Sequence, residues 1–291
     1  MAEGGVGLNI LIALAPAFFW GILPLVVSRV GGTPVQQIIG TTVGTLLVSI
    51  VVAMIMPPTL SSTVFWYSFA SGACWAFGQM NQYRSFLQIG VSNAMPVSTG
   101  MQLVSTSLVG VLVFGEWPTL ADKVLGFCAI ALIVLGIYLT THQEGEGHEG
   151  VDMRAGVITL LISTVGYVGY SYFPRAGHID GQDAFLPQAV GMVAMSLVMP
   201  LFFRGSKPFN RKTVQNLLGG FIFAAAALAY LLSAYRNGIA TGFTLSQMNV
   251  VLATLGSIYI LGEKKTRKEM GYVLTGLALV VAGGIMIGLN A

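Results

Sequence analysis

The chain has 291 residues and a formal net charge of +3; 55% of its residues are hydrophobic and only 9% are charged. Because soluble domains carry about 25% charged residues, this composition excludes a water-soluble globule. The small net charge gives no indication of a nucleic-acid partner. A bilayer requires every backbone polar group to be satisfied internally, by helices or by a closed barrel. The long apolar runs favour helices, so we predict an all-α membrane protein.

Ten apolar stretches of membrane-spanning length follow one another along the chain. A transmembrane helix requires about 20 mainly apolar residues, so ten helices account for nearly the whole length and leave no room for a soluble catalytic domain. The first stretch lacks the features of a cleavable signal peptide, and we expect it to be a mature helix. The predicted spans are Leu8–Ser28, Val35–Met56, Thr63–Ile89, Asn93–Phe114, Ala121–Thr141, Arg154–Pro174, Asp183–Phe203, Thr213–Asn237, Ala240–Leu261 and Glu269–Leu289.

The longest polar connection lies in the middle of the chain. Its core, His142–Asp152, contains four acidic residues, two His and three Gly. Such a segment is typical of a flexible linker. We therefore divide the chain into a first five-helix half (residues 1–141), a linker (residues 142–153) and a second five-helix half (residues 154–291).

The basic residues predict the orientation, because cytoplasmic connections of membrane proteins are enriched in Lys and Arg. Of the 14 basic residues, three lie on the side of the N-terminus: Lys123, Arg175 and Arg236. We therefore expect both termini outside the cell and the linker in the cytoplasm. The other eleven lie on the opposite side: Arg29, Arg84, Arg154, Arg204, Lys207, Arg211, Lys212, Lys264, Lys265, Arg267 and Lys268.

Short patterns recur in the two halves in the same order. Gln37–Gly40 and Gln188–Gly191 share the pattern Gln-x-x-Gly early in the second helix of each half, and Gly115-Glu116 and Gly262-Glu263 close the fourth helix of each half. An odd number of helices per half means that the second half is inverted relative to the first. Inverted repeats are typical of secondary transporters, which bind their substrate near the midplane of the bilayer.

The sequence contains no recognisable catalytic or metal-binding pattern. All three His lie in connections, no acidic residue lies near the middle of a predicted span, and the two cysteines lie in apolar runs. Metalloprotease, nucleophile-elbow and phosphate-loop motifs are missing. We therefore predict no enzyme activity, no metal and no cofactor.

Amide and aromatic side chains occur deep within the predicted spans instead. Trp75, Gln79 and Gln82 share one face of the third helix. An amide offers two donors and an acceptor to a hydroxyl, and an aromatic face packs against the C–H side of a sugar ring. This set, without a buried charge, favours a neutral polyol as substrate. The predicted substrate-binding residues are Trp20, Trp75, Gln79, Gln82, Asn93, Gln102, Tyr167, Gln188 and Asn249.

Each of these residues has a structural alternative. Polar side chains in membrane helices often join helices by hydrogen bonds of about 0.6 kcal/mol. Glu116 and Glu263, at the ends of their helices, are either solvated helix termini or sites of proton coupling or gating. A second possible function is the export of lipophilic cations, which usually requires a carboxylate within the membrane, and the sequence shows none there. A third is a sensor or scaffold, which would require a soluble domain or long tails, and the sequence shows neither.

Three motifs of the third and fourth helices are distinctive: Trp75-Ala-Phe-Gly-Gln79-Met-Asn81-Gln82, Ile89-Gly-Val-Ser-Asn93-Ala-Met-Pro96-Val-Ser98-Thr-Gly-Met-Gln102-Leu and Gly115-Glu116-Trp117. They resemble the bacterial glucose uptake proteins, which belong to the glucose/ribose porter family of the drug/metabolite transporter superfamily. The resemblance covers the whole chain and is most specific in these two helices. It implies ten helices in two inverted halves, and uptake of glucose with a proton as the co-transported partner.

Two segments depart from the glucose pattern. Phe185-Leu-Pro187-Gln188 and Ala240-Thr-Gly-Phe243 look more like the ribose uptake members of the family. The sequence thus leaves a hexose and a pentose open as substrates. Proton coupling is implied by the resemblance alone, so uncoupled facilitated diffusion stays a second mechanism, and the oligomeric state is not predicted.

Overall fold

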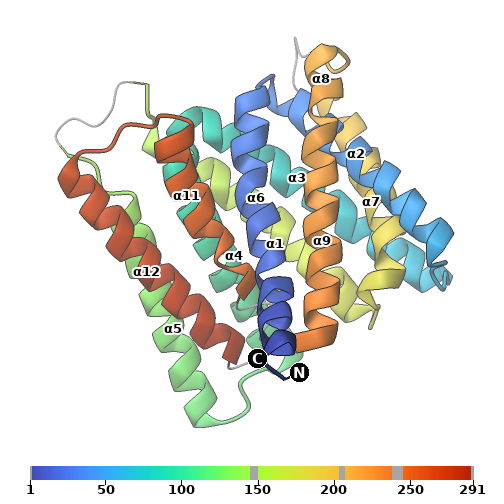
Figure 1. Ribbon diagram of the computed structural model, residues 1–291, viewed down its shortest axis with the longest axis horizontal. Coiled ribbons are helices and arrows are strands. Elements are labelled where there is room, and N and C mark those ends of the chain that lie inside the picture. Colours follow the sequence, from blue (N-terminus) through green and yellow to red (C-terminus); the bar gives the residue numbers. More distant parts are fainter. Residues whose placement is uncertain (1, 145–149, 203–206, 238–244, 290–291) are drawn as a thin grey trace. The chain divides into compact units, whose positions relative to one another are not determined.

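The protein is helical throughout the part of the chain that its structure, a computed structural model, describes: residues 2–144, 150–202, 207–237 and 245–289 (Figure 1). No strand occurs among these residues. In chain order the elements are α1 (Ala2–Val30), α2 (Pro34–Ile55), α3 (Ser62–Ile89), α4 (Val91–Phe114), α5 (Leu120–Thr140), α6 (Met153–Ala176), α7 (Gly181–Val198), the 3₁₀ turn η1 (Met199–Leu201), α8 (Arg211–Gln215), α9 (Leu217–Asn237), α11 (Asn249–Ile260) and α12 (Arg267–Leu289).

Most of the helices coincide with the predicted spans, but the eighth span is divided at Asn216 into α8 and α9, and the ninth is described below. Seven of the described segments are long and apolar enough to cross a bilayer. Leu14–Val30 in α1 and Asn249–Ile260 are shorter apolar helices. Helix α3 is long enough to cross a bilayer, at 28 residues, but it is not among the seven, because polar and small side chains are distributed along its whole length. The chain is thus an all-α, multi-pass membrane protein.

The ninth predicted span, Ala240–Leu261, was wrong as a single continuous helix. Its first residues, 240–244, lie outside the described residues; in the rest, a turn at Gln247–Met248 precedes α11. The Nδ2 of Asn249 donates to the carbonyl of Ser246 at 2.8 Å, whereas the backbone N–H of Val250 donates to Gln247, three residues back, at 3.3 Å. The Asn249 side chain therefore takes the carbonyl that a continuous helix would offer to Val250.

The contacts divide the chain into two compact units. Unit one comprises Met1–Leu25, Ser85–Val157 and Ala225–Ala291, and unit two comprises Val26–Arg84 and Ile158–Ala224. Each unit draws segments from both halves of the sequence. The division of the chain into two inverted repeats stays a prediction.

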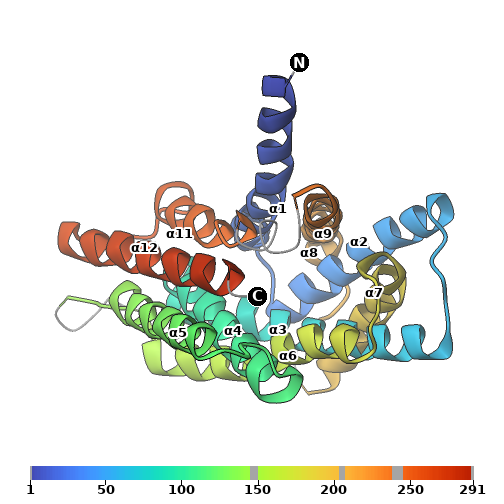
Figure 2. The same ribbon diagram turned by 90° about the horizontal axis from the view of Figure 1, so that it is seen from below.

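In unit one, α5 and α12 run side by side (Figures 1 and 2). Two glycines allow this approach: a Cβ on Gly136 would lie 2.6 Å from the carbonyl oxygen of Gly276, and a Cβ on Gly276 would lie 2.5 Å from that of Gly136. Small residues at such crossings let membrane helices pack closely. Helix α4 also packs on this pair through a core formed by Leu103, Ala129, Ile133 and Ile287.

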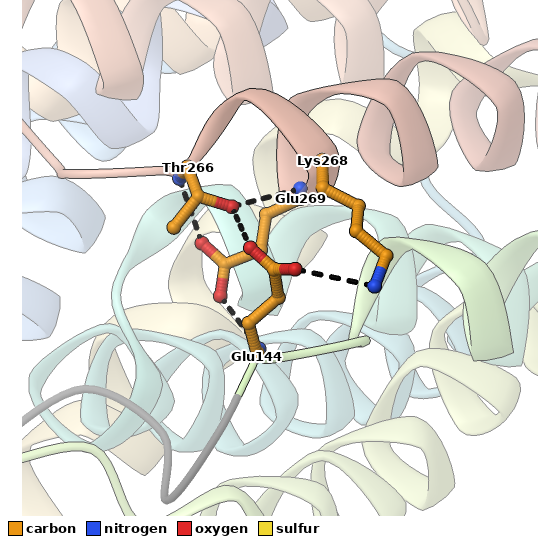
Figure 3. Close-up of polar contacts among 4 residues, drawn as sticks. All are labelled: Glu144, Thr266, Lys268 and Glu269. Atoms are coloured by element: carbon orange, nitrogen blue, oxygen red, sulfur yellow. Dashed lines mark hydrogen bonds and ion pairs between the residues drawn. The ribbon is translucent and has the colours of Figure 1, made fainter.

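The start of α12 is bonded to Glu144, near the start of the predicted linker (Figure 3). Thr266 and Glu269 form a capping box, since Glu269 N–H donates to Thr266 Oγ1 at 3.1 Å and Thr266 N–H to Glu269 Oε2 at 3.0 Å. The other oxygen of Glu269 accepts from the backbone N–H of Glu144 at 3.0 Å. Glu144 in turn accepts from the Thr266 hydroxyl and pairs with Lys268 at 3.3 Å.

In unit two, α2 packs against α7 (Figure 1). The hydroxyls of Thr42 and Ser196 lie 2.8 Å apart and join the two helices. Gln37 in α2 donates to the carbonyl of Val27 in α1 at 3.3 Å. Polar side chains therefore hold the helices of this unit together.

Candidate functional site

Three buried side chains of unit two form a hydrogen-bonded group, which we call the amide–phenol cluster: Gln79 and Gln82 of α3 and Tyr167 of α6. Gln79 Nε2 donates to Gln82 Oε1 at 2.8 Å. The Tyr167 hydroxyl lies 2.9 Å from Gln79 Oε1 and 3.0 Å from Gln82 Oε1. Each of the three residues is 5 or 6% exposed. The one-face spacing on α3 thus brings together three of the predicted substrate-binding residues.

The hydrogen-bonding capacity of the cluster is not used up. The Tyr167 hydroxyl has one hydrogen, but two amide oxygens lie within its reach. The two oxygens must therefore share that one hydrogen. Gln79 Nε2 carries two hydrogens, and the second finds no acceptor among the described residues. The cluster can therefore both donate to and accept from an added hydroxyl group.

Helix α6 places Tyr167 by means of a serine one turn earlier. Ser163 Oγ donates to the carbonyl of Gly78 at 2.7 Å. Because residues four apart share a helical face, this bond docks α6 on α3 and aims Tyr167 at the residues that follow Gly78. Ser163 was not among the predicted site residues, although its spacing of four residues from Tyr167 could have indicated it.

Trp75 lies one turn before Gln79 on α3. It is 3% exposed, and its ring centroid lies 4.3 Å from that of Phe223 in α9. Gln188 of α7 donates to Ser71 Oγ at 3.0 Å, and Ser71 donates to the carbonyl of Tyr170 at 2.7 Å. Gln188 therefore joins α7 to α3, and its side-chain oxygen has no donor among the described residues.

Three further candidates belong to unit one, and each has a different contact. Trp20 packs against Tyr230, with ring centroids 5.7 Å apart. Gln102 donates to Ser98 Oγ at 2.9 Å. Asn249 caps the carbonyl of Ser246, as described above. No hydrogen bond or ring contact among the described residues joins Trp20, Gln102 and Asn249, so their role in binding stays a prediction.

Unit one also contains a pocket of about 370 Å³ at the start of α4, which we call the α4 pocket. Both carboxylate oxygens of Glu263 cap this helix: Oε1 accepts from Val91 N–H at 2.7 Å, and Oε2 accepts from Ser92 N–H at 2.9 Å. A carboxylate is favoured here because the first N–H groups of a helix have no partner within the helix. The lining residues are Ile89, Gly90, Ser92, Asn93, Val151, Glu263, Lys264 and Lys265.

Lys265 brings a second charge to the α4 pocket. Its Nζ donates to Asn93 Oδ1 at 2.7 Å, and Asn93 Nδ2 donates to the carbonyl of Ile89 at 2.7 Å. Burial lowers the pKa of Lys265, while Glu269 and Glu263 act in the opposite direction. Lys265 was predicted only to indicate the orientation of the chain in the membrane, because a run of basic residues at the end of a helix usually does so.

Glu116 and Glu263 share the same backbone arrangement but differ in their side-chain contacts. A left-handed glycine precedes each of them, with φ of 68° at Gly115 and 77° at Gly262, and each N–H donates to the carbonyl six residues back, at 3.1 Å for Glu116 and 3.3 Å for Glu263. The Glu116 carboxylate folds back over Gly110 on the same helix. No group of three metal-ligating side chains occurs in the described part of the chain.

The family of sugar transport proteins matches residues 11–290 of this chain. A Listeria monocytogenes protein named for sugar uptake is 53% identical, over 97% of this chain and 99% of its own length. A Latilactobacillus sakei protein named for ribose uptake is 47% identical, over 95% and 96%. A Bacillus anthracis protein named for glucose uptake is 43% identical, over 97% and 99%.

One solved crystal structure also resembles the protein. It matches with a TM-score of 0.61 and covers 97% of each chain, at 16% sequence identity. A likeness at this level of identity concerns the fold alone, and it extends over nearly the whole chain.

Proposed function

Since the chain belongs to the family of sugar transport proteins, we propose that it takes up a monosaccharide, with glucose as the first candidate, across the bacterial plasma membrane. In this proposal the substrate site includes the amide–phenol cluster, and Trp75 and Gln188 of the same unit add an aromatic face and a free amide oxygen. Trp20, Asn93, Gln102 and Asn249 are the further contacts that we propose.

The observation that carries the proposal is the spare hydrogen-bonding capacity of the cluster. A sugar hydroxyl donates one hydrogen bond and accepts others, and the cluster offers both an acceptor shared between two amides and an unused N–H of Gln79. None of its three side chains carries a charge at neutral pH. A neutral site favours a neutral polyol, because a charged substrate would require a counter-charge.

The proposed mechanism is alternating access with proton symport, in which the two halves move around the bound sugar. Glu116 and Glu263 are the residues that we propose for proton coupling or gating. Protonation of Glu263 would weaken the cap on α4, because the neutral acid loses the charge that favours the helix N-terminus. Uncoupled facilitated diffusion is the alternative mechanism.

The test is uptake of labelled glucose by proteoliposomes that contain the purified protein. We expect Gln79→Ala to lower uptake at least tenfold, with the same amount of folded protein in the membrane. The matched control is Asn81→Ala: Asn81 is equally buried and lies two residues away on the same helix, but it bonds only to the carbonyl of Phe77. Equal uptake by the two variants would contradict the proposed site.

The same assay shows whether uptake is coupled to protons and which sugar is transported. An inward proton gradient that concentrates the sugar would indicate symport, and equilibration that ignores the gradient would indicate a facilitator. Ribose is the second candidate substrate, because of the segment Phe185–Gln188 and because a relative named for ribose uptake is 47% identical. Uptake of ribose without uptake of glucose would mean that the substrate is a pentose and not a hexose.

A further inference from the structure

A buried hydroxyl in the α4 pocket has no partner. Ser92 is 1% exposed, its Oγ makes no hydrogen bond in the structure, and the residue lines the pocket. Serines in helices commonly donate to a carbonyl of the preceding turn. A buried hydroxyl without any partner costs about 1–3 kcal/mol, so a ligand in the pocket would remove this penalty.

The charged groups around the pocket also keep unused hydrogen-bonding capacity. An ammonium group has three donors, and Lys265 uses one of them, on Asn93. Each oxygen of Glu263 accepts one backbone N–H and can accept a second hydrogen. Ile89 and Val151 supply an apolar surface between these polar groups. The pocket thus presents donors, acceptors and an apolar wall together.

This combination suits a neutral polyol better than an anion. A hydroxyl can donate to Glu263 and accept from Lys265. A phosphate or carboxylate would be attracted by Lys264 and Lys265, but it would be repelled by Glu263 and could not donate to the spare acceptor sites of that carboxylate. At about 370 Å³, the pocket lies at the small end of the range of ligand sites, about 300–1,000 Å³, as expected for a monosaccharide.

We propose that the α4 pocket is a second monosaccharide site, distinct from the amide–phenol cluster. This proposal rests on the proposed function, since it takes the transported sugar as the ligand. The pocket is built from helix ends and connections, where water can enter without crossing the spans. By the predicted orientation these ends face the cytoplasm, so the site would hold the sugar as it leaves or enters on that side.

The test places a reporter thiol in the pocket of the full-length protein. Cys74 and Cys128 are first replaced by Ala, and Val151→Cys then supplies a thiol on the half-buried wall. We expect glucose or ribose to slow modification of this thiol by a water-soluble reagent at least fivefold. Arg267→Cys, an exposed position outside the pocket lining, is the control and should react at the same rate with and without sugar.

Two variants separate this site from the amide–phenol cluster. Protection of the Val151→Cys thiol should persist when Gln79→Ala is added, and loss of protection would mean that the sugar acts from the cluster. Ser92→Ala should raise the half-protecting sugar concentration about three- to tenfold. Ser68→Ala is its matched control, since Ser68 is a buried serine without a partner that does not line the pocket, and it should change nothing.

The outcomes also distinguish this proposal from the proposed function. Uptake of sugar without protection of the thiol would overturn the second site and leave the transport proposal standing. Protection of the thiol by sugar without any uptake would support the second site and overturn the transport proposal. Protection by inorganic phosphate alone would identify an anion site and overturn the assignment to a neutral sugar.

Discussion

The amide–phenol cluster and the α4 pocket differ in the chemistry of the groups that they offer to a ligand. The cluster in unit two is made of two amides and a phenol, which are uncharged at neutral pH and buried between helices. The α4 pocket in unit one lies at helix ends and is lined by Glu263, Lys264 and Lys265. Charge occurs where helices end, because a charged group within the hydrocarbon costs several kcal/mol.

This difference has consequences that can be measured. Changes in the cluster should alter sugar uptake by the same factor across the pH range in which amides and phenols do not titrate. Changes in the α4 pocket should alter properties that depend on the salt concentration, because salt screens its charges. The variants below test this separation, from the largest expected effect to the smallest.

Tyr167→Phe removes the only hydroxyl of the amide–phenol cluster. We expect sugar uptake, expressed as kcat/KM, to fall at least tenfold, which corresponds to about 1.4 kcal/mol. The loss should be the same with and without a proton gradient, since the tyrosine is not a coupling residue. Tyr138→Phe, on the exposed side of α5, is the control. Uptake unchanged in Tyr167→Phe would mean that the cluster only joins α3 to α6.

Gly276→Ala changes the packing of unit one without changing its charges. The new methyl group would lie 2.5 Å from the Gly136 carbonyl, and backbone cannot move aside as a flexible side chain can. Overpacking of this kind costs about 1–3 kcal/mol, so we expect a lower apparent Tm in detergent. Gly271→Ala, in the same helix but with nothing within 4 Å, should keep or raise the Tm. Equal Tm values for the two variants would contradict the close α5–α12 approach.

Glu263→Gln removes the charge from the cap of α4 but keeps one acceptor oxygen. We expect the free energy of unfolding to fall by about 1 kcal/mol, because a helix N-terminus favours an anion. Should Glu263 carry the coupled proton, glucose uptake by this variant will also stop responding to a proton gradient. The control is Asp152→Asn. Asp152 is exposed, accepts from the N–H of Ala155 and does not line the pocket. A gradient response equal to that of the unchanged protein would remove Glu263 from the coupling.

Much of the fold follows from the sequence, since apolar runs of about 20 residues define helices wherever a bilayer surrounds them. The ninth span shows the limit: its average hydropathy predicted one helix, whereas a single side chain, Asn249, competes for a backbone carbonyl and starts α11 later. This competition depends on the rotamer of one side chain, and the average hydropathy of a segment carries no information about a rotamer.

The candidate site was predictable in part, and for a similar reason. Gln79 and Gln82 share a helical face, so their proximity follows from spacing within one helix. The pairing of Asn93 with Lys265 joins residues 172 positions apart, and no spacing rule relates them. Lys265 also looked like an orientation signal, and only its half-buried position in the α4 pocket indicates a second role.

The smallest expected effect concerns Glu144, at the start of the linker (Figure 3). The Thr266 hydroxyl, followed by Lys268, lowers the pKa of Glu144 from its usual value of 4.5. A carboxyl whose pKa is lower in the folded state stabilises that state above the usual pKa, and this contribution disappears as the pH falls through the lower folded value. Because Glu144 is exposed to solvent, we expect only a small decrease in Tm over this acidic range. Glu144→Gln should remove that part of the pH dependence, and high salt should weaken it in the unchanged protein. The same pH profile in both proteins would mean that the backbone N–H of Glu144, bound to Glu269, holds the segment without help from the side chain.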